Sequence, residues 1–118
     1  MKSSLLFQYA WSRFLRFVVA AELLILTALA FSLTGGLLAL GTMALLLRCG
    51  RFSLFGVSIA GAAAHNTGQI LAAMAVLGSR APLAYLPPLL LCSLATGAFT
   101  GGVSAMLVRR IPAPLRAD

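Results

Sequence analysis

Three long apolar runs, each bounded by arginine, constrain the fold of this chain more than any other feature. The runs on either side of Arg80 hold 28 residues each without a formal charge. A further run between Arg16 and Arg48 holds 31 residues and is interrupted only by Glu22. A membrane-spanning helix needs about 20 apolar residues, so every run is long enough to cross a bilayer.

The composition supports a lipid environment. Of 118 residues, 61% are hydrophobic and only 9% are charged, whereas soluble domains carry about 25% charged residues. So few charges cannot cover a water-facing surface. We therefore predict an all-α integral membrane bundle, with the lipid bilayer as its first partner and the inner (plasma) membrane as its location.

The chain has a net charge of +7, and all nine of its cationic side chains lie at the ends of the apolar runs. Nucleic-acid binding requires a clustered basic face together with a recognisable motif, and the sequence has neither. The tendency of cationic residues to remain on the cytoplasmic side of a membrane explains the same arginines. We expect no nucleic-acid partner.

The same rule predicts the number of helices. As a single helix the 31-residue run is roughly 46 Å long, against a hydrocarbon core of about 30 Å, and its centre, FSLTGG at residues 31–36, is typical of a turn. A hairpin there places eight of the nine cations on one side and leaves only Arg80 opposite, whereas one tilted span, the alternative, divides them four to five. The sequence therefore predicts one domain, residues 1–118, with both termini cytoplasmic and a short cytoplasmic tail at 111–118. The four expected helices lie near 13–29, 33–47, 54–77 and 86–108.

Catalytic chemistry is not expected. Apart from the terminal Asp118, Glu22 is the only acid, and phosphate-binding loops and paired carboxylates are absent from the sequence. Cys49 and Cys92 have no partner at metal-ligand spacing. We predict no enzyme activity, cofactor or metal. Glu22 either pairs with an arginine near the membrane surface or serves as a counter-charge to His65 or to a cationic ligand.

A polar trio lies near the middle of the run that follows Arg51: His65, Asn66 and Gln69. His65 and Gln69 share a helical face, and Asn66 lies about 100° further round. Polar side chains at this depth are costly and face a bundle interior or a watery cavity. Two interpretations stay open, interhelical hydrogen bonding and a ligand-binding site.

Small residues recur every four positions in the last run, which favours close helix packing. A similar row in the preceding run predicts that the two faces meet, although glycines lining a ligand path are the alternative. The first row is Ser93, Gly97, Gly101 and Ala105, and the second is Ala60, Ala64, Gly68 and Ala72.

Three segments together resemble the Gx transporter family, which is also catalogued as heptaprenyl diphosphate synthase component I. They are FSLTGGLLALGTMALL at 31–46, GVSIAGAAAHNTGQILAA at 56–73 and YLPPLLLCSLATGAFTGGVSAML at 85–107. Arg16 also falls where such proteins carry an arginine before a helix. Family members have further N-terminal helices, so the resemblance implies a short variant, one part of a split protein, or a partner that supplies the remaining helices.

The resemblance also implies a function, because members are similar to the substrate-binding S components of energy-coupling-factor transporters. The first hypothesis is therefore a small-molecule-binding subunit that relies on a separate ATPase module. The second is a non-catalytic membrane component of a heptaprenyl or polyprenyl diphosphate synthase. The third is a structural subunit of a membrane complex, or of a homo-oligomer, in which the polar trio only joins helices.

Overall fold

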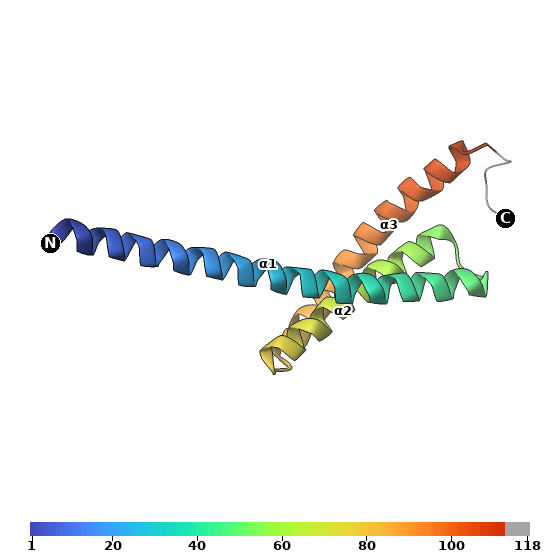
Figure 1. The fold of residues 1–118 in the computed structure, drawn as a ribbon. Coiled ribbons are helices and arrows are strands. Elements are labelled where there is room, and N and C mark those ends of the chain that lie inside the picture. The colour runs from blue at the N-terminus through green and yellow to red at the C-terminus, as the bar shows by residue number, and fades with distance from the viewer. Residues whose placement is uncertain (113–118) are drawn as a thin grey trace. The chain divides into compact units, whose positions relative to one another are not determined.

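A computed structural model describes residues 1–112 and shows an all-α chain, as predicted (Figure 1). Its elements are α1 (Lys2–Cys49), α2 (Leu54–Leu77), the short 3-10 helix η1 (Ala81–Tyr85) and α3 (Leu86–Arg110). The chain divides into two compact units, residues 1–30 and residues 31–118. The prediction of one domain, residues 1–118, stays a prediction. Because the division falls inside α1, the C-terminal part of this helix belongs to the second unit.

The turn expected at residues 31–36 is absent, because α1 continues through all six of them. The prediction of separate helices near 13–29 and 33–47 is therefore wrong, and residues 1–112 contain three α-helices rather than four. The charge count that favoured four spans depended on that hairpin. The location of both termini in the cytoplasm stays a prediction.

The physical reason for the continuous helix is local, since residues 2–49 contain no helix breaker stronger than glycine. Each glycine in a helix costs only about 1 kcal/mol relative to alanine, whereas an interior proline costs about 3 kcal/mol. No proline precedes Pro82, and Gly35 and Gly36 do not have the positive φ that a glycine turn uses. The glycine pair is therefore tolerated inside the helix.

Both ends of α2 are defined by local capping, and its bounds coincide with the expected range 54–77. At the start, the Ser53 hydroxyl accepts a hydrogen bond from the Gly56 N–H at 3.2 Å, which satisfies a donor that the first turn leaves free. At the end, Gly78 takes the left-handed conformation with φ 59° and its N–H donates to the Met74 carbonyl. Glycine adopts this conformation without the penalty that a Cβ brings.

Prolines fix the start of α3, which runs two residues beyond the expected range 86–108. Pro87 and Pro88 lie in the first turn, where the missing N–H of proline costs no helical hydrogen bond. The helix ends at Arg110, and Ile111 is extended. Most of the predicted tail at 111–118 lies outside the described residues.

Two helical stretches are long and apolar enough to cross a membrane, Lys2–Cys49 and Ala81–Arg110. Only 6% and 17% of their most apolar windows are buried, whereas the core helix of a soluble protein is mostly buried. Large side chains such as Leu24 and Phe99 are 70% and 74% exposed, so these helices present apolar surface that the rest of the described chain does not cover.

Candidate functional site

The second unit brings three helices together through glycines. The C-terminal part of α1 packs against α2 where Gly35 meets Gly68. A Cβ added at Gly35 would lie 2.7 Å from the His65 carbonyl oxygen, and one added at Gly68 would lie 2.8 Å from Gly35 Cα. Both distances are too short for real Cβ atoms, so only glycine permits this close approach of the two backbones.

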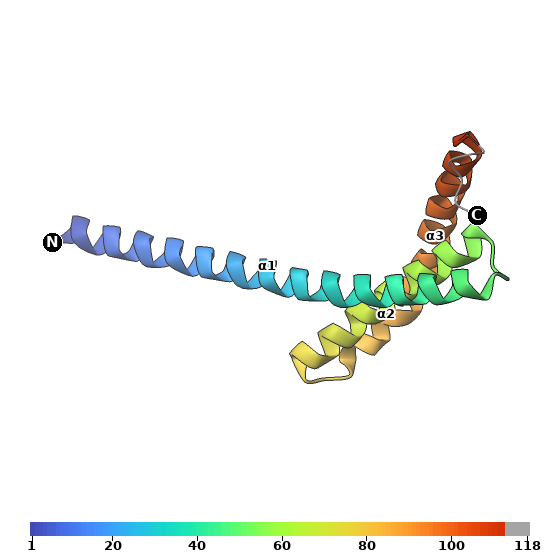
Figure 2. The ribbon, with the colours of Figure 1, turned by 45° about the vertical axis from the view of Figure 1, so that its right-hand side comes forward.

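On another side of α2, the small-residue row of α3 makes a second close contact, and α2 and α3 run alongside each other in both views (Figures 1 and 2). A Cβ added at Gly97 would lie 2.5 Å from Ile59 Cα, and one added at Gly101 would lie 2.9 Å from Phe55 Cα. Ser93, Gly97 and Gly101 are buried and Ala105 is half-buried.

The two small-residue rows do not face each other as expected. Gly68 lies against Thr34 and Gly35 of α1, whereas Gly97 and Gly101 lie against the N-terminal half of α2. The spacing of small residues predicts that a helix face is packed, but it does not specify which neighbour packs there.

Asn66 forms the polar link between α2 and α3. Its side-chain nitrogen donates to the Leu89 carbonyl at 3.0 Å and to the Ser93 hydroxyl at 2.8 Å. The Ser93 hydroxyl in turn donates to the Leu89 carbonyl at 2.9 Å, and Ser93 is completely buried. Asn66 therefore acts in this structure as an interhelical hydrogen-bond donor.

His65 lines a hollow of about 260 Å³ at the junction of α1, α2 and α3, which we refer to as the cavity; it is open on the side of Thr96 and Thr100, both of which are exposed. Volume of this size corresponds to roughly nine waters at about 30 Å³ each, which is enough for a small molecule. The lining residues are Ala39 and Met43 from α1, Ser58, Gly61, Ala62 and His65 from α2, and Thr96, Gly97 and Thr100 from α3. None of them carries a permanent charge.

The two threonines offer only hydrogen-bond acceptors to this cavity. Thr96 Oγ1 donates to the Cys92 carbonyl at 3.0 Å, and Thr100 Oγ1 donates to the Thr96 carbonyl at 2.8 Å. A hydroxyl has one proton and two lone pairs, so these oxygens can still accept but have no second proton to give. Within residues 1–112 the structure records no hydrogen bond to the side chains of His65 or Ser58, which leaves both available to a ligand.

The other predicted site residues lie elsewhere. Gln69 is half-buried, and its Cγ would lie 3.1 Å from a Cβ at Gly35, so its side chain packs on α1. Glu22 belongs to the unit of residues 1–30 and is exposed there. Of the predicted ligand-binding residues, His65 alone lines the cavity.

Sequence reasoning did not select Met43, Thr96 or Thr100 as site residues. Thr96 and Thr100 are four apart, which places both hydroxyls on one helical face, and this spacing is the signal that could have identified them. Met43 carries no such signal, because an apolar side chain in an apolar run becomes a cavity wall only through the packing of α1 on α2.

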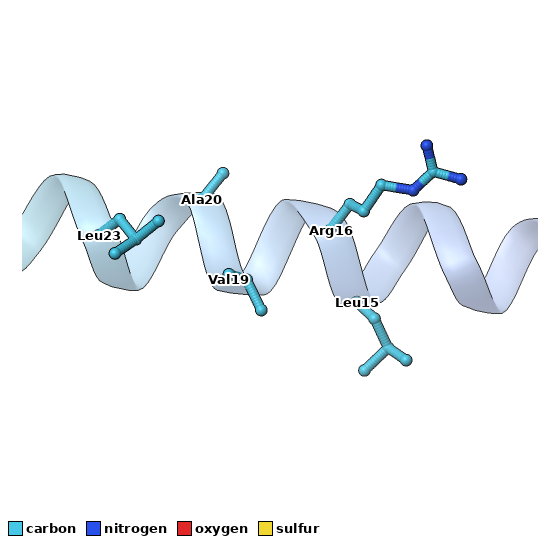
Figure 3. A pocket seen from close by; sticks show the side chains of 5 residues that line it. All are labelled: Leu15, Arg16, Val19, Ala20 and Leu23. Atoms are coloured by element: carbon cyan, nitrogen blue, oxygen red, sulfur yellow. The ribbon is translucent and has the colours of Figure 1, made fainter.

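Two other hollows are less suited to a polar ligand. One, of about 440 Å³, lies on α2, η1 and α3 and is lined by Ile70, Ala73, Leu77, Pro82, Tyr85, Pro88, Leu89 and Cys92. The other is lined by α1 alone, where Arg16 and Ala20 point to one side and Leu15 and Val19 to the other (Figure 3). Since a single helix forms all its walls, the second hollow is a surface groove rather than a closed site.

Comparison with known proteins gives one match. A protein-family model described as heptaprenyl diphosphate synthase component I matches residues 5–107, a range that includes every residue lining the cavity. No curated protein and no solved structure matches the chain.

Proposed function

This chain belongs to the heptaprenyl diphosphate synthase component I family, and from that premise we propose that it is a non-catalytic, small-molecule-binding subunit of a membrane transport complex. It crosses the inner membrane more than once and binds its ligand in the cavity beside His65. A separate ATPase module, or another partner protein, supplies the energy for transport.

The cavity at the three-helix junction is the observation that carries this proposal. Its walls combine an imidazole and three hydroxyls with apolar groups, which is the mixture that orients a small ligand inside an apolar pocket. Because no lining residue is Asp, Glu, Lys or Arg, the walls offer no counter-charge to a charged ligand, which favours a neutral one.

The hydrogen-bond pattern narrows the ligand class further. Thr96 and Thr100 present acceptor oxygens only, since their protons are used within α3. We therefore expect a neutral ligand that donates hydrogen bonds, through hydroxyl or amide groups, to these two oxygens. His65 can either donate or accept, depending on its tautomer.

Two different substitutions test the cavity. His65→Ala removes the imidazole, and Ala62→Leu fills the space without removing a polar group. Both variants are expected to lose the small molecule that co-purifies with the parent protein in mild detergent, as detected by mass spectrometry. Uptake of that molecule should fall by at least about tenfold, the loss expected from about 1.4 kcal/mol of binding energy.

Thr67→Ala is the matched control, because the Thr67 hydroxyl donates to Ala63 of its own helix at 2.8 Å and does not line the cavity. This variant should retain the ligand. If His65→Ala and Ala62→Leu fold and keep ligand and uptake at the control's level, the cavity is not the binding site.

A second candidate function is a non-catalytic membrane component of a polyprenyl diphosphate synthase. The family's description favours it, and the wholly apolar hollow on α2, η1 and α3 has the chemistry that an isoprenoid chain requires. Purification in mild detergent separates the two candidates: a co-purifying prenyl synthase whose activity rises with this subunit supports the second, and a co-purifying ATPase supports the first.

A further inference from the structure

The first turns of α1 separate basic and aromatic side chains onto opposite faces. Lys2, Tyr9, Arg13 and Arg16 fall within about 60° of one another on a helix, and Phe7, Trp11 and Phe14 fall within a similar arc. The centres of the two arcs are roughly 160° apart at 100° per residue. We refer to the first set as the basic face and to the second as the aromatic face.

Contacts within each face support this division. On the aromatic face, the Trp11 ring centre lies 6.4 Å from that of Phe7 and 5.8 Å from that of Phe14. On the basic face, the Arg13 guanidinium lies 5.7 Å from the centre of the Tyr9 ring and donates to the Tyr9 hydroxyl at 3.4 Å. The three aromatic rings therefore form one continuous surface, and Tyr9 and Arg13 form an interacting pair on the basic face.

The aromatic face requires an apolar cover. Phe7, Trp11 and Phe14 are 70%, 53% and 55% exposed. With 48 residues, α1 has more than twice the number, about 20, that one membrane crossing needs. Lys2, Arg13 and Arg16 all precede the long apolar run of α1, which only Glu22 interrupts, and this order is typical of a segment at the edge of a membrane core.

The charges of this segment indicate which kind of surface contacts it. Residues 1–21 contain three cationic side chains and no acid, so the complementary surface is anionic next to the basic face and apolar next to the aromatic face. The boundary between phospholipid headgroups and acyl chains has both properties, and helices with Lys and Arg on one face and Trp, Phe and Leu on the other bind there. Trp and Tyr are also enriched at this depth.

We propose that residues 2–17 bind anionic phospholipids. Lys2, Arg13 and Arg16 bind the headgroup phosphates, and the aromatic face inserts at the level of the first acyl carbons. Tyr9 positions Arg13, whose planar guanidinium binds phosphate through two parallel hydrogen bonds. This lipid site is independent of the cavity beside His65.

Trp11 is the only tryptophan in the chain, so its fluorescence reports this segment alone. The full-length protein is reconstituted into phosphatidylcholine vesicles that contain 30 mol% phosphatidylglycerol, with bromine-labelled acyl chains on one lipid or the other at the same total bromine content. Brominated phosphatidylglycerol is expected to quench Trp11 at least about twofold more than brominated phosphatidylcholine, because each cation near the surface attracts anionic lipid. Raising the salt to 0.5 M should reduce the difference.

The triple variant Lys2→Gln/Arg13→Gln/Arg16→Gln is expected to show equal quenching by the two brominated lipids. Arg48→Gln/Arg51→Gln, which removes cations outside the segment, is the control and should keep the preference. Equal quenching in the parent protein, or a preference that survives in the triple variant, overturns the proposal. Shielding of Trp11 from both bromine and aqueous acrylamide also overturns it, because a second copy or another protein then covers the aromatic face.

Discussion

Asn66 and His65 are adjacent in α2, yet their side chains lie in different surroundings. The Asn66 amide bonds α3 at two points, whereas the His65 ring lines the cavity and packs beside Gly35. The sequence left interhelical bonding and ligand binding as alternatives for the whole polar trio. At the scale of single residues, interhelical bonding holds for Asn66, whereas ligand binding by His65 stays a prediction. The two side chains can differ because neighbouring positions on a helix point about 100° apart.

Removal of the Asn66 amide tests the role of this side chain as a hydrogen-bond donor between α2 and α3. Asn66→Ala leaves the Leu89 carbonyl and the Ser93 hydroxyl without their interhelical donor, so we expect a loss of about 0.6–2 kcal/mol of stability, the range for polar contacts between membrane helices. Thermal unfolding in detergent, followed by loss of helical signal, measures the difference. Thr67→Ala, which removes a bond within α2 only, should change the stability by less than about 0.5 kcal/mol; equal losses in both variants would contradict the interhelical role.

At the scale of elements, the glycine pair in α1 is a packing position rather than a turn. Gly35 lies against α2, and Gly36 has no atom within 4 Å of the place where a Cβ would lie. Adjacent glycines in sequence therefore have different roles. The sequence motif FSLTGG contains both, but no local signal distinguishes the glycine that touches a second helix from the one that does not.

Gly35→Ala and Gly36→Ala form a matched pair for this contact. The alanine at 35 would approach the His65 carbonyl at 2.7 Å, so the helices must separate, and we expect a loss of about 1–3 kcal/mol as for other overpacked sites. The alanine at 36 meets no atom and should stabilise the helix by up to about 1 kcal/mol. Unfolding in detergent measures both, and a turn at residues 31–36 would instead make the two substitutions similarly harmful.

At the scale of the whole molecule, we predict that the segment forming α1 crosses the membrane once, because residues 31–36 continue the helix instead of forming a turn. A single crossing places residue 3 and Cys49 on opposite sides, whereas the hairpin expected from the charge count places them on the same side. Whether residue 3 and Cys49 lie on the same side of the membrane therefore depends only on whether residues 31–36 form a turn. It does not depend on how many times the rest of the chain crosses the membrane.

Two single-cysteine proteins measure sidedness directly. One keeps Cys49 and carries Cys92→Ser, and the other carries Ser3→Cys with Cys49→Ser and Cys92→Ser. A membrane-impermeant maleimide applied to intact cells and to inverted membrane vesicles should label the two positions from opposite sides. Labelling of both positions from the same side would restore the hairpin and the prediction of four spans.

The sequence alone determined the all-α class, the limits of α2 and the start of α3, because apolar run length, capping residues and prolines act locally. Three of its segments also identified the family. It did not determine the path of α1, since the helical tendency of the neighbouring residues outweighs the weak turn tendency of two glycines. Only the tertiary structure decided that Asn66 binds α3, that Gly68 meets α1, and that His65 shares a cavity with Met43 and two threonines. These outcomes depend on which helix faces meet, and spacing along one helix carries no information about its neighbours.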